Sequence, residues 1–350
     1  MTRSRATTSQ ARQSSLSWLI RGCLASLLLY ALAFGLLLDR PLAFGFLRAQ
    51  IDAKLEHAAT INEPKLVILA GSNGPYSHRC QIIEPLIHMP CLNGGVAVGV
   101  GLDYLFARWK HYLHRGDLVY LPMEEAQYVR TQAATDVGPD AAIMFRHDWR
   151  TLAALSPDRW LAGLFAFDLR FALMAPTEAS LQLAHFHDPR PEVTGTMNAW
   201  GDHVGHTAEL AMPNQAMVAS LPRGHASAEQ VSSGYGTSLI VSFIHWANAH
   251  GVRVIGGLPT EFADHPMPVA TQEAIQSVYR ANGADFIVLP NFSRYPRSAF
   301  FDSAEHLNET WQIVHSKLLA EQLRWHHAPI AAAHPDDPTG RPAPHNMPTN

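Results

Sequence analysis

Three polar residues of this chain have types and positions that suit acyl chemistry at a serine. Ser72 follows an apolar, β-branched run that starts at Lys65, and it lies in the turn-forming sequence Gly71-Ser72-Asn73-Gly74. This pattern places the serine at the carboxyl end of a buried strand, where open α/β sheets carry their chemistry. A developing oxyanion is stabilised there by the amino end of the next helix. A strand followed by a plain glycine-rich turn is the alternative interpretation.

A serine becomes a nucleophile when a base takes its proton and a third group orients that base. The candidates are His306, as the base, and Asp302, four residues before it. We expect His306 on a loop between the last strand and the closing helix, at the same sheet edge as Ser72. Glu305 is the poorer orienting group, because neighbouring side chains diverge. The alternative is that His306 is an ordinary residue at the start of a helix.

The elements that must position these residues alternate between strand and helix. We predict strands that begin at Lys65 and cover 118–121, 253–256 and 285–289, and helices over 76–87, 102–113, 238–248, 271–282 and 307–323. This alternation favours an α/β fold with a doubly wound parallel sheet. The predicted domain covers 65–325, with 129–235 as an inserted cap or subdomain that includes a helix over 160–173. Residues 326–350 are predicted to form a disordered tail.

The amino-terminal region predicts a membrane anchor. Residues 1–21 carry Arg3, Arg5, Arg12 and Arg21 without an acidic residue, and 22–38 are apolar and uncharged. These roughly 17 residues reach about 26 Å as a helix, close to a hydrocarbon core of about 30 Å. The positive-inside rule places 1–21 in the cytoplasm and the rest outside, after a linker over 39–64. A cleaved signal peptide is the alternative.

Charge and cysteines narrow the class of protein. A net charge of −4 over 350 residues, with no long Lys/Arg block, argues against a nucleic-acid partner. Cys80 and Cys91, with ten residues between them, form a plausible disulfide in an oxidising compartment; in the cytosol they would be two buried thiols. We expect no metal, because the sequence Asp-His-x-x-His at 202–206 lacks a further spaced ligand. No cofactor is expected, since the glycines at 94–101 do not fit a dinucleotide site.

The same residues resemble the sequence blocks of the SGNH, or GDSL-type, hydrolase superfamily. Gly71-Ser72-Asn73 is similar to the nucleophile block, Asn93-Gly94-Gly95 to the second block, and Asp302 with His306-Leu307 to the last block. The resemblance implies a flavodoxin-like sheet and an oxyanion hole made by the amides of Ser72 and Gly95. It covers most of residues 65–325 and leaves the insertion unmatched.

Two features depart from the family pattern. The gap between Asp302 and His306 is one residue longer than the common Asp-x-x-His, and the third block differs. Where the family has Gly-x-Asn-Asp, this chain has Leu121-Pro122-Met123-Glu124-Glu125, so a further oxyanion donor has to be sought in Asn73 or Asn291. Glu124, Asn291 and Trp200 are the candidates for substrate contact; a tryptophan can stack on a sugar ring, although Trp149, Trp160 and Trp200 could equally be core residues.

The segment from Asn93 to Tyr128 is similar to exported proteins of bacterial exopolysaccharide acylation, as for alginate or cellulose. The resemblance implies a single-pass inner-membrane protein whose periplasmic domain acts as an O-acetyltransferase or acetylesterase on a polysaccharide. Implied partners are a membrane-bound O-acyltransferase or a polysaccharide synthase complex. The alternative from another class is a catalytically inactive glycan-binding or scaffold protein. A lipid esterase is a third possibility.

Overall fold

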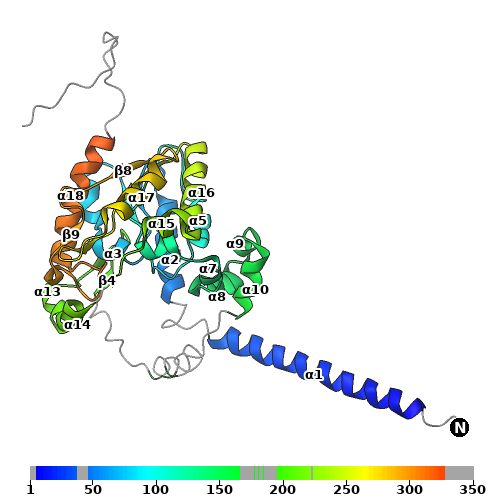
Figure 1. Cartoon of the computed structure of the whole chain (residues 1–350). Helices are drawn as coiled ribbons and strands as arrows, with labels where there is room; N and C mark the ends of the chain where they lie inside the picture. Colours follow the sequence, from blue (N-terminus) through cyan, green and yellow to red (C-terminus); the bar gives the residue numbers. More distant parts are fainter. Residues whose placement is uncertain are drawn as a thin grey trace, which may run out of the picture.

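The computed structural model describes residues 5–37, 46–165, 195–221 and 224–327, together with Thr177, Ser180 and Ala184. The chain begins with α1 (Arg5–Leu37), which projects away from the rest of the molecule (Figure 1). Its stretch Ser15–Leu32 is long and apolar enough to cross a membrane and is not buried in the protein. The predicted apolar helix is therefore present, although its most apolar window begins earlier than residue 22. A signal sequence would have the same properties.

The centre of the domain is a five-stranded parallel sheet with the order β2-β1-β3-β6-β8. Its strands are β1 (Leu66–Ile68), β2 (Cys91–Asn93), β3 (Leu118–Leu121), β6 (Arg253–Gly257) and β8 (Asp285–Ile287). The predicted mixed α/β fold with a parallel sheet is confirmed. Strand β2 had no signal in the sequence, because Cys91-Leu92-Asn93 contains none of the β-branched residues that mark β1 and β8. The order reverses around β1, so β2 and β3 flank it and their carboxyl ends meet at one edge.

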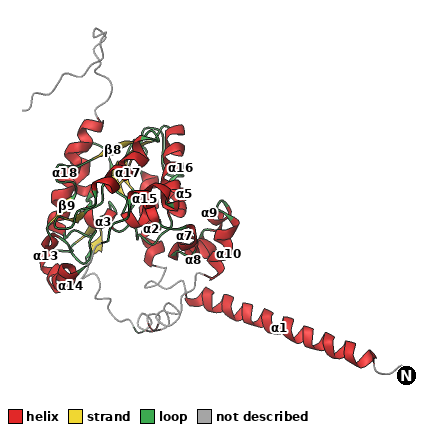
Figure 2. Cartoon of the chain, in the orientation of Figure 1, coloured by secondary structure: helices red, strands yellow, loops and turns green. Residues whose placement is uncertain are grey.

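Helices cover both faces of this sheet, as the layers in Figure 2 show. Successive residues of β1 point to opposite faces. Val67 lies in one buried cluster with Phe106 and Phe243, whereas Leu66 lies in a second cluster with Leu319. The first face carries α5 (Leu102–Trp109), α16 (Tyr235–Ala249) and α17 (Val269–Arg280); the second carries α4 (Cys80–Ile87) and α18 (Glu309–His327). Pro85 lies inside α4 and does not end it.

The segment predicted to be a linker belongs to the folded domain. Residues 46–60 form α2 (Phe46–Thr60), and Ile51, Leu55 and Ala58 on it are buried in the first cluster. These three residues lie at i, i+4 and i+7, which is one face of a helix. The folded domain therefore begins by Phe46 rather than at Lys65.

The described residues of the predicted insertion form two groups of short elements, which contact each other between residues 125–129 and 228–233. The first is a group of helices that contacts α5: α6 (Glu125–Val129), α7 (Gln132–Asp136), α8 (Pro139–His147), α9 (Trp149–Ala153) and α10 (Pro157–Phe165). The second contains the hairpin β4 (Thr196–Met197) and β5 (His203–Val204), then α13 (Ala208–Ala211), η2 (Met212–Asn214), α14 (Gln215–Ser220) and α15 (Ala228–Ser233). The helix predicted over 160–173 starts at Pro157, and residues 166–173 and 328–350 lie outside the described residues.

Candidate active site

Ser72 lies directly after β1, at the first turn of the short helix α3 (Asn73–Ser77). Its side chain makes no capping hydrogen bond to α3, which leaves its hydroxyl for another partner. Little room is left for a side chain before the serine. A Cβ atom at Gly71 would lie 2.4 Å from Oε1 of Glu124 and 3.2 Å from the Cα atom of Val98. A larger residue at this position would therefore have to displace the carboxylate of Glu124.

Ser72, His306 and Asp302 form one chain of hydrogen bonds. Nε2 of His306 lies 2.7 Å from Oγ of Ser72, and Nδ1 lies 2.6 Å from Oδ1 of Asp302. A carboxylate can only accept, so Nδ1 carries the proton and Nε2 is the acceptor for the serine hydroxyl. The structure thus brings together the three residues that the sequence predicted, and in the tautomer that activates a serine.

The loop that carries Asp302 and His306 is closed on itself. The N–H of Phe301 donates to the carbonyl of His306 at 2.8 Å, and the Oγ of Ser303 accepts from the N–H of His306 at 3.2 Å. An isolated β-bridge pairs the residues at 300 and 307. This turn lets the aspartate reach the imidazole although three residues separate them, one more than the family pattern has.

The same loop is fixed to the nucleophile helix. The carbonyl of Glu305 accepts from Oγ of Ser77, at the end of α3, at 2.7 Å. It also accepts from Oγ1 of Thr260 at 2.9 Å. Ser77 and Thr260 are both fully buried. Because α3 also begins beside Ser72, these bonds fix the position of the His306 loop relative to the serine.

The departure in the third block has a structural role. Glu124 begins α6 in a capping box with Gln127. Oε1 of Gln127 accepts from the N–H of Glu124 at 3.0 Å and from the N–H of Gly71 at 3.2 Å. Oε1 of Glu124 accepts from the N–H of Asn73 at 3.2 Å. The capping box therefore holds the backbone on both sides of Ser72, which the sequence pattern did not indicate.

The predicted oxyanion donors differ in whether they already have a hydrogen-bond acceptor. The N–H of Gly95 donates to Oδ1 of Asn93 at 3.2 Å, so an oxyanion would have to share that donor. Asn73 points elsewhere: its Nδ2 donates to the carbonyl of Pro122 at 2.7 Å and its N–H to Glu124. This geometry argues against the predicted role of Asn73. The N–H of Ser72 donates to no acceptor among the described residues.

An aromatic stack supports the imidazole of His306. The ring of Tyr76, on α3, lies parallel to it with centroids 4.1 Å apart and an interplanar angle of 10°. The opposite face of Tyr76 stacks on His203 at 4.2 Å. Burial, and then the charge of Asp302, raise the pKa of the Tyr76 hydroxyl well above its usual value. Neither the stack nor Tyr76 had a sequence signal, because its partners lie far away along the chain.

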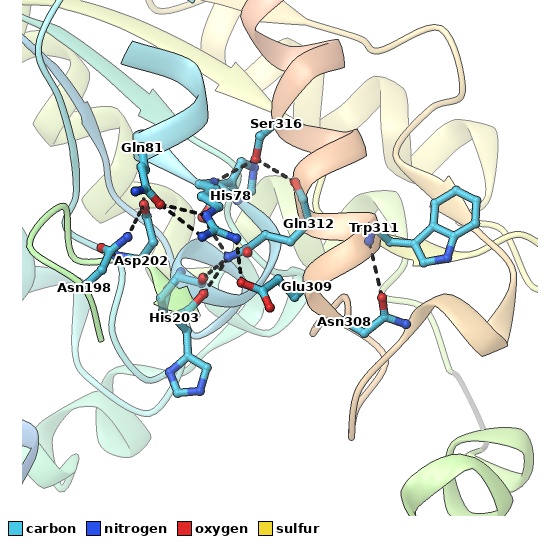
Figure 3. A network of polar contacts seen from close by, with 12 residues as sticks. His78, Gln81, Asn198, Asp202, His203, Asn308, Glu309, Trp311, Gln312 and Ser316 are labelled. Atoms are coloured by element: carbon cyan, nitrogen blue, oxygen red, sulfur yellow. Dashed lines mark hydrogen bonds and ion pairs between the residues drawn. The ribbon is translucent and has the colours of Figure 1, made fainter. Parts of the chain in front are cut away.

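The possible metal ligands at 202–206 serve other purposes. The carboxylate of Asp202 accepts from the N–H groups of Cys80 and Gln81 at 2.8 and 3.1 Å, at the amino end of α4. Figure 3 shows Asn198 and Gln81 on either side of it. Nε2 of Gln312 donates to the carbonyl of His203 at 3.0 Å. Among the described residues, no group of three or more His, Cys, Asp or Glu side chains is arranged to hold a metal ion.

His206 is buried next to the stack. Neither of its ring nitrogens has a hydrogen-bond partner within the described part of the chain. Burial, followed by the neighbouring His203, lowers the pKa of His206 to about 3. The side chain therefore acts as a neutral aromatic ring beside Tyr76 and Phe301.

Two of the predicted substrate-contact residues have structural roles. Nε1 of Trp200 donates to Glu84 on α4 at 3.0 Å, and its ring packs against the second core cluster. The side chain of Asn291 donates to the carbonyl of Arg294 and accepts from the N–H of Ser293, within its own turn. These contacts argue against a role in substrate binding. The predicted disulfide is confirmed: it joins Cys80, at the start of α4, to Cys91 in β2.

A cleft of about 570 Å³ adjoins the catalytic loop. Its walls include Glu124, which contacts the turn at Ser72, and the loop residues 303–305, which directly precede His306. Leu221 and His225 from the second inserted segment line the other side. The volume is within the usual range for small-molecule sites. Of the predicted contact residues, Glu124 lies at this cleft.

Comparisons with protein-family models, with curated proteins and with solved structures find no match for this chain. The functional argument therefore rests on the geometry of the site.

Proposed function

We propose that this protein is a serine enzyme of SGNH type that transfers or removes an acyl group, with acetyl on an exopolysaccharide as the expected substrate. The single observation that carries the proposal is the hydrogen-bonded chain from Ser72 through His306 to Asp302, at 2.7 and 2.6 Å. The sheet order, 2-1-3-4-5 when its strands are numbered along the chain, supports the flavodoxin-like class to which SGNH enzymes belong.

In the proposed reaction, Oγ of Ser72 attacks the acyl carbonyl carbon while its proton passes to Nε2 of His306. Asp302 stabilises the imidazolium that forms. The proton then goes to the departing oxygen, which leaves an acyl-serine. In the second half, a sugar hydroxyl or water attacks the acyl group, and His306 takes its proton and returns it to Ser72. The N–H groups of Ser72 and Gly95 are the proposed donors to the oxyanion.

We place the domain on the periplasmic side of a bacterial inner membrane, held by α1 as a single span. Two observations support this placement. The helix window Ser15–Leu32 is apolar and exposed, and the domain carries the Cys80–Cys91 disulfide, which persists in oxidising compartments. A polysaccharide is the proposed substrate and a membrane-bound O-acyltransferase or a polysaccharide synthase complex the proposed partner.

The test is turnover of acetyl esters, first a chromogenic acetyl ester and then an acetylated polysaccharide, by the full-length protein in detergent. Ser72→Ala and His306→Ala should each lower kcat by about 10³-fold or more. Ser220→Ala, in exposed α14, is the matched serine control and should leave the rate unchanged. Equal rates in wild type, Ser72→Ala and His306→Ala would remove the enzyme proposal. A preference for long acyl chains over acetyl would indicate a lipid esterase.

A second candidate function is a catalytically inactive glycan-binding or scaffold protein. The observation that favours it is that donors near Ser72 are engaged: the N–H of Gly95 bonds to Asn93, and the backbone N–H and one side-chain N–H of Asn73 are used elsewhere. This candidate predicts polysaccharide binding that Ser72→Ala leaves intact, together with no measurable ester turnover by the wild type.

A further inference from the structure

A buried lysine from the helix after the membrane span contacts the active-site turn. Lys54, on α2, is only 3% exposed, and its Nζ donates a hydrogen bond to the carbonyl of Gly95. Gly95 belongs to the second of the blocks that surround Ser72. The contact spans 41 residues of chain and joins two elements that the sequence places in separate regions.

Gly95 is packed directly on the nucleophile turn. A Cβ atom at Gly95 would lie 2.9 Å from the Cα of Gly74 and 3.0 Å from the carbonyl oxygen of Gly71. No side chain separates the two turns, so a displacement of the Gly95 peptide would be transmitted to the backbone beside Ser72. Its carbonyl is held by Lys54 on one side, while its N–H is held by Asn93.

The burial of Lys54 does not contribute favourably to the stability of the fold. It forms no ion pair with a described residue, and Asp202 is the charged group that acts on it from a distance. Burial lowers the pKa of Lys54 to about 7, and Asp202 offsets part of that effect. By contrast, the buried Lys65 is paired with Asp117 at 2.9 Å at the opposite edge of the sheet. A buried ammonium without a paired carboxylate is expected where it serves a site.

We propose that Lys54 is a positioning residue of the active site, which fixes the turn at residues 94–96 against Ser72 and so couples the juxtamembrane helix α2 to acyl chemistry. This role rests on the proposed function of the Ser72 site. Lys54 touches no reacting atom; it acts through the Gly95 peptide, whose N–H is a proposed oxyanion donor. The helix next to the membrane is thus a part of the catalytic domain and not only a spacer.

The test compares Lys54→Met with Lys65→Met in the full-length protein in detergent. Methionine keeps the length of the side chain without its charge. We expect Lys54→Met to lower kcat by about 10- to 100-fold with a KM close to that of the wild type. The change in its melting temperature should be small, because the removal of a buried charge offsets the loss of the donor to the Gly95 carbonyl. Lys65→Met leaves Asp117 unpaired, so it should lower the melting temperature without changing kcat per folded molecule.

Hydrogen exchange provides a readout that does not need turnover. Amides in the peptide 93–98 should exchange about tenfold faster in Lys54→Met than in the wild type, while Lys65→Met leaves them unchanged. Unchanged exchange at 93–98 would overturn the role of Lys54, whether or not the protein hydrolyses esters. If the wild type is active, a kcat of Lys54→Met equal to that of the wild type would also overturn this role. If the wild type shows no turnover but Lys54→Met loosens 93–98, the proposed function fails, and Lys54 holds the turn at 94–96 without a role in acyl chemistry.

Discussion

The imidazole of His306 lies 2.7 Å from the hydroxyl of Ser72, although 234 positions separate the two residues in the sequence. Hydrogen bonds of neighbouring residues help to hold the two side chains at this distance. The carbonyl of Glu305 is held by Ser77 and Thr260, and the backbone around Ser72 is held by Gln127 and Glu124. The geometry of the proposed active site therefore depends on the backbone that surrounds Ser72 and His306.

The carboxylate of Asp302 fixes the tautomer of His306. Asp302→Asn can donate to Nδ1 and so favours the wrong tautomer, and we expect kcat to fall by about 10³-fold, in line with other Ser-His-Asp sites. The control is Asp285→Asn, which removes an exposed pair with Arg253 that contributes little. Steady-state kinetics on an acetyl ester checks both variants. A similar rate for Asp302→Asn and wild type would show that another group orients the base.

The ring of Tyr76 should matter more than its hydroxyl. Tyr76→Phe keeps the parallel stack on His306, so its kcat should stay close to that of the wild type. Tyr76→Leu removes the stack between His306 and His203 and leaves the imidazole less restrained, and we expect a loss in kcat of about tenfold. If the Phe variant were as impaired as the Leu variant, the hydroxyl would be the important group.

Gln127 links the third strand to the nucleophile turn. Gln127→Leu leaves the buried N–H groups of Gly71 and Glu124 without an acceptor, at about 1–3 kcal/mol each. Both the free energy of unfolding and kcat should decrease. The control is Ser227→Ala, which breaks the capping box of α15 and should cost about 1 kcal/mol without affecting kcat. Urea unfolding and kinetics distinguish the two; an equal kcat for both variants would exclude a positioning role for Gln127.

Three buried histidines should make the fold sensitive to acid. Burial lowers the pKa of His78 to about 4 and of His206 to about 3, and places that of His315 well below its usual value. Below about pH 6.5 these histidines are protonated in the unfolded chain but stay neutral in the folded protein. Their contribution to the free energy of unfolding is therefore fully present above that pH and is lost as the pH decreases. For each histidine, the free energy of unfolding should decrease by roughly 2 kcal/mol between pH 6.5 and 5.

His206→Phe isolates one of these contributions, because the ring of His206 makes no hydrogen bond to a described residue. The free energy of unfolding should decrease less between pH 6.5 and 5 in this variant than in the wild type, and the urea midpoint at each pH measures the difference. Other groups, such as Asp140, whose pKa burial raises to about 6, titrate equally in both proteins and cancel. Identical pH dependence in the two proteins would mean that folding does not lower the pKa of His206.

Local sequence patterns predicted most of the helices and strands whose residues form a clear apolar pattern. Leu118–Leu121 was predicted with its observed bounds, and α5, α16 and α17 were located to within a few residues. Strand β2 was missed because its residues include no β-branched side chain, whereas the equally short β1 and β8 do. Segment 39–64 was predicted to be a linker, and the burial of α2 was missed because burial depends on which surface its apolar face contacts.

The sequence by itself determined the chemical types at the site: a serine after a buried strand, a histidine with an aspartate before the last helix, and two cysteines in one segment. It determined these because they depend on residue identity and on neighbours within a few positions. Only the tertiary structure decided that Glu124 and Gln127 hold the serine turn, that Tyr76 stacks on His306, and that Lys54 reaches Gly95. Those relationships depend on distances between segments that no local pattern encodes, since they are fixed by packing and hydrogen bonds across the whole fold.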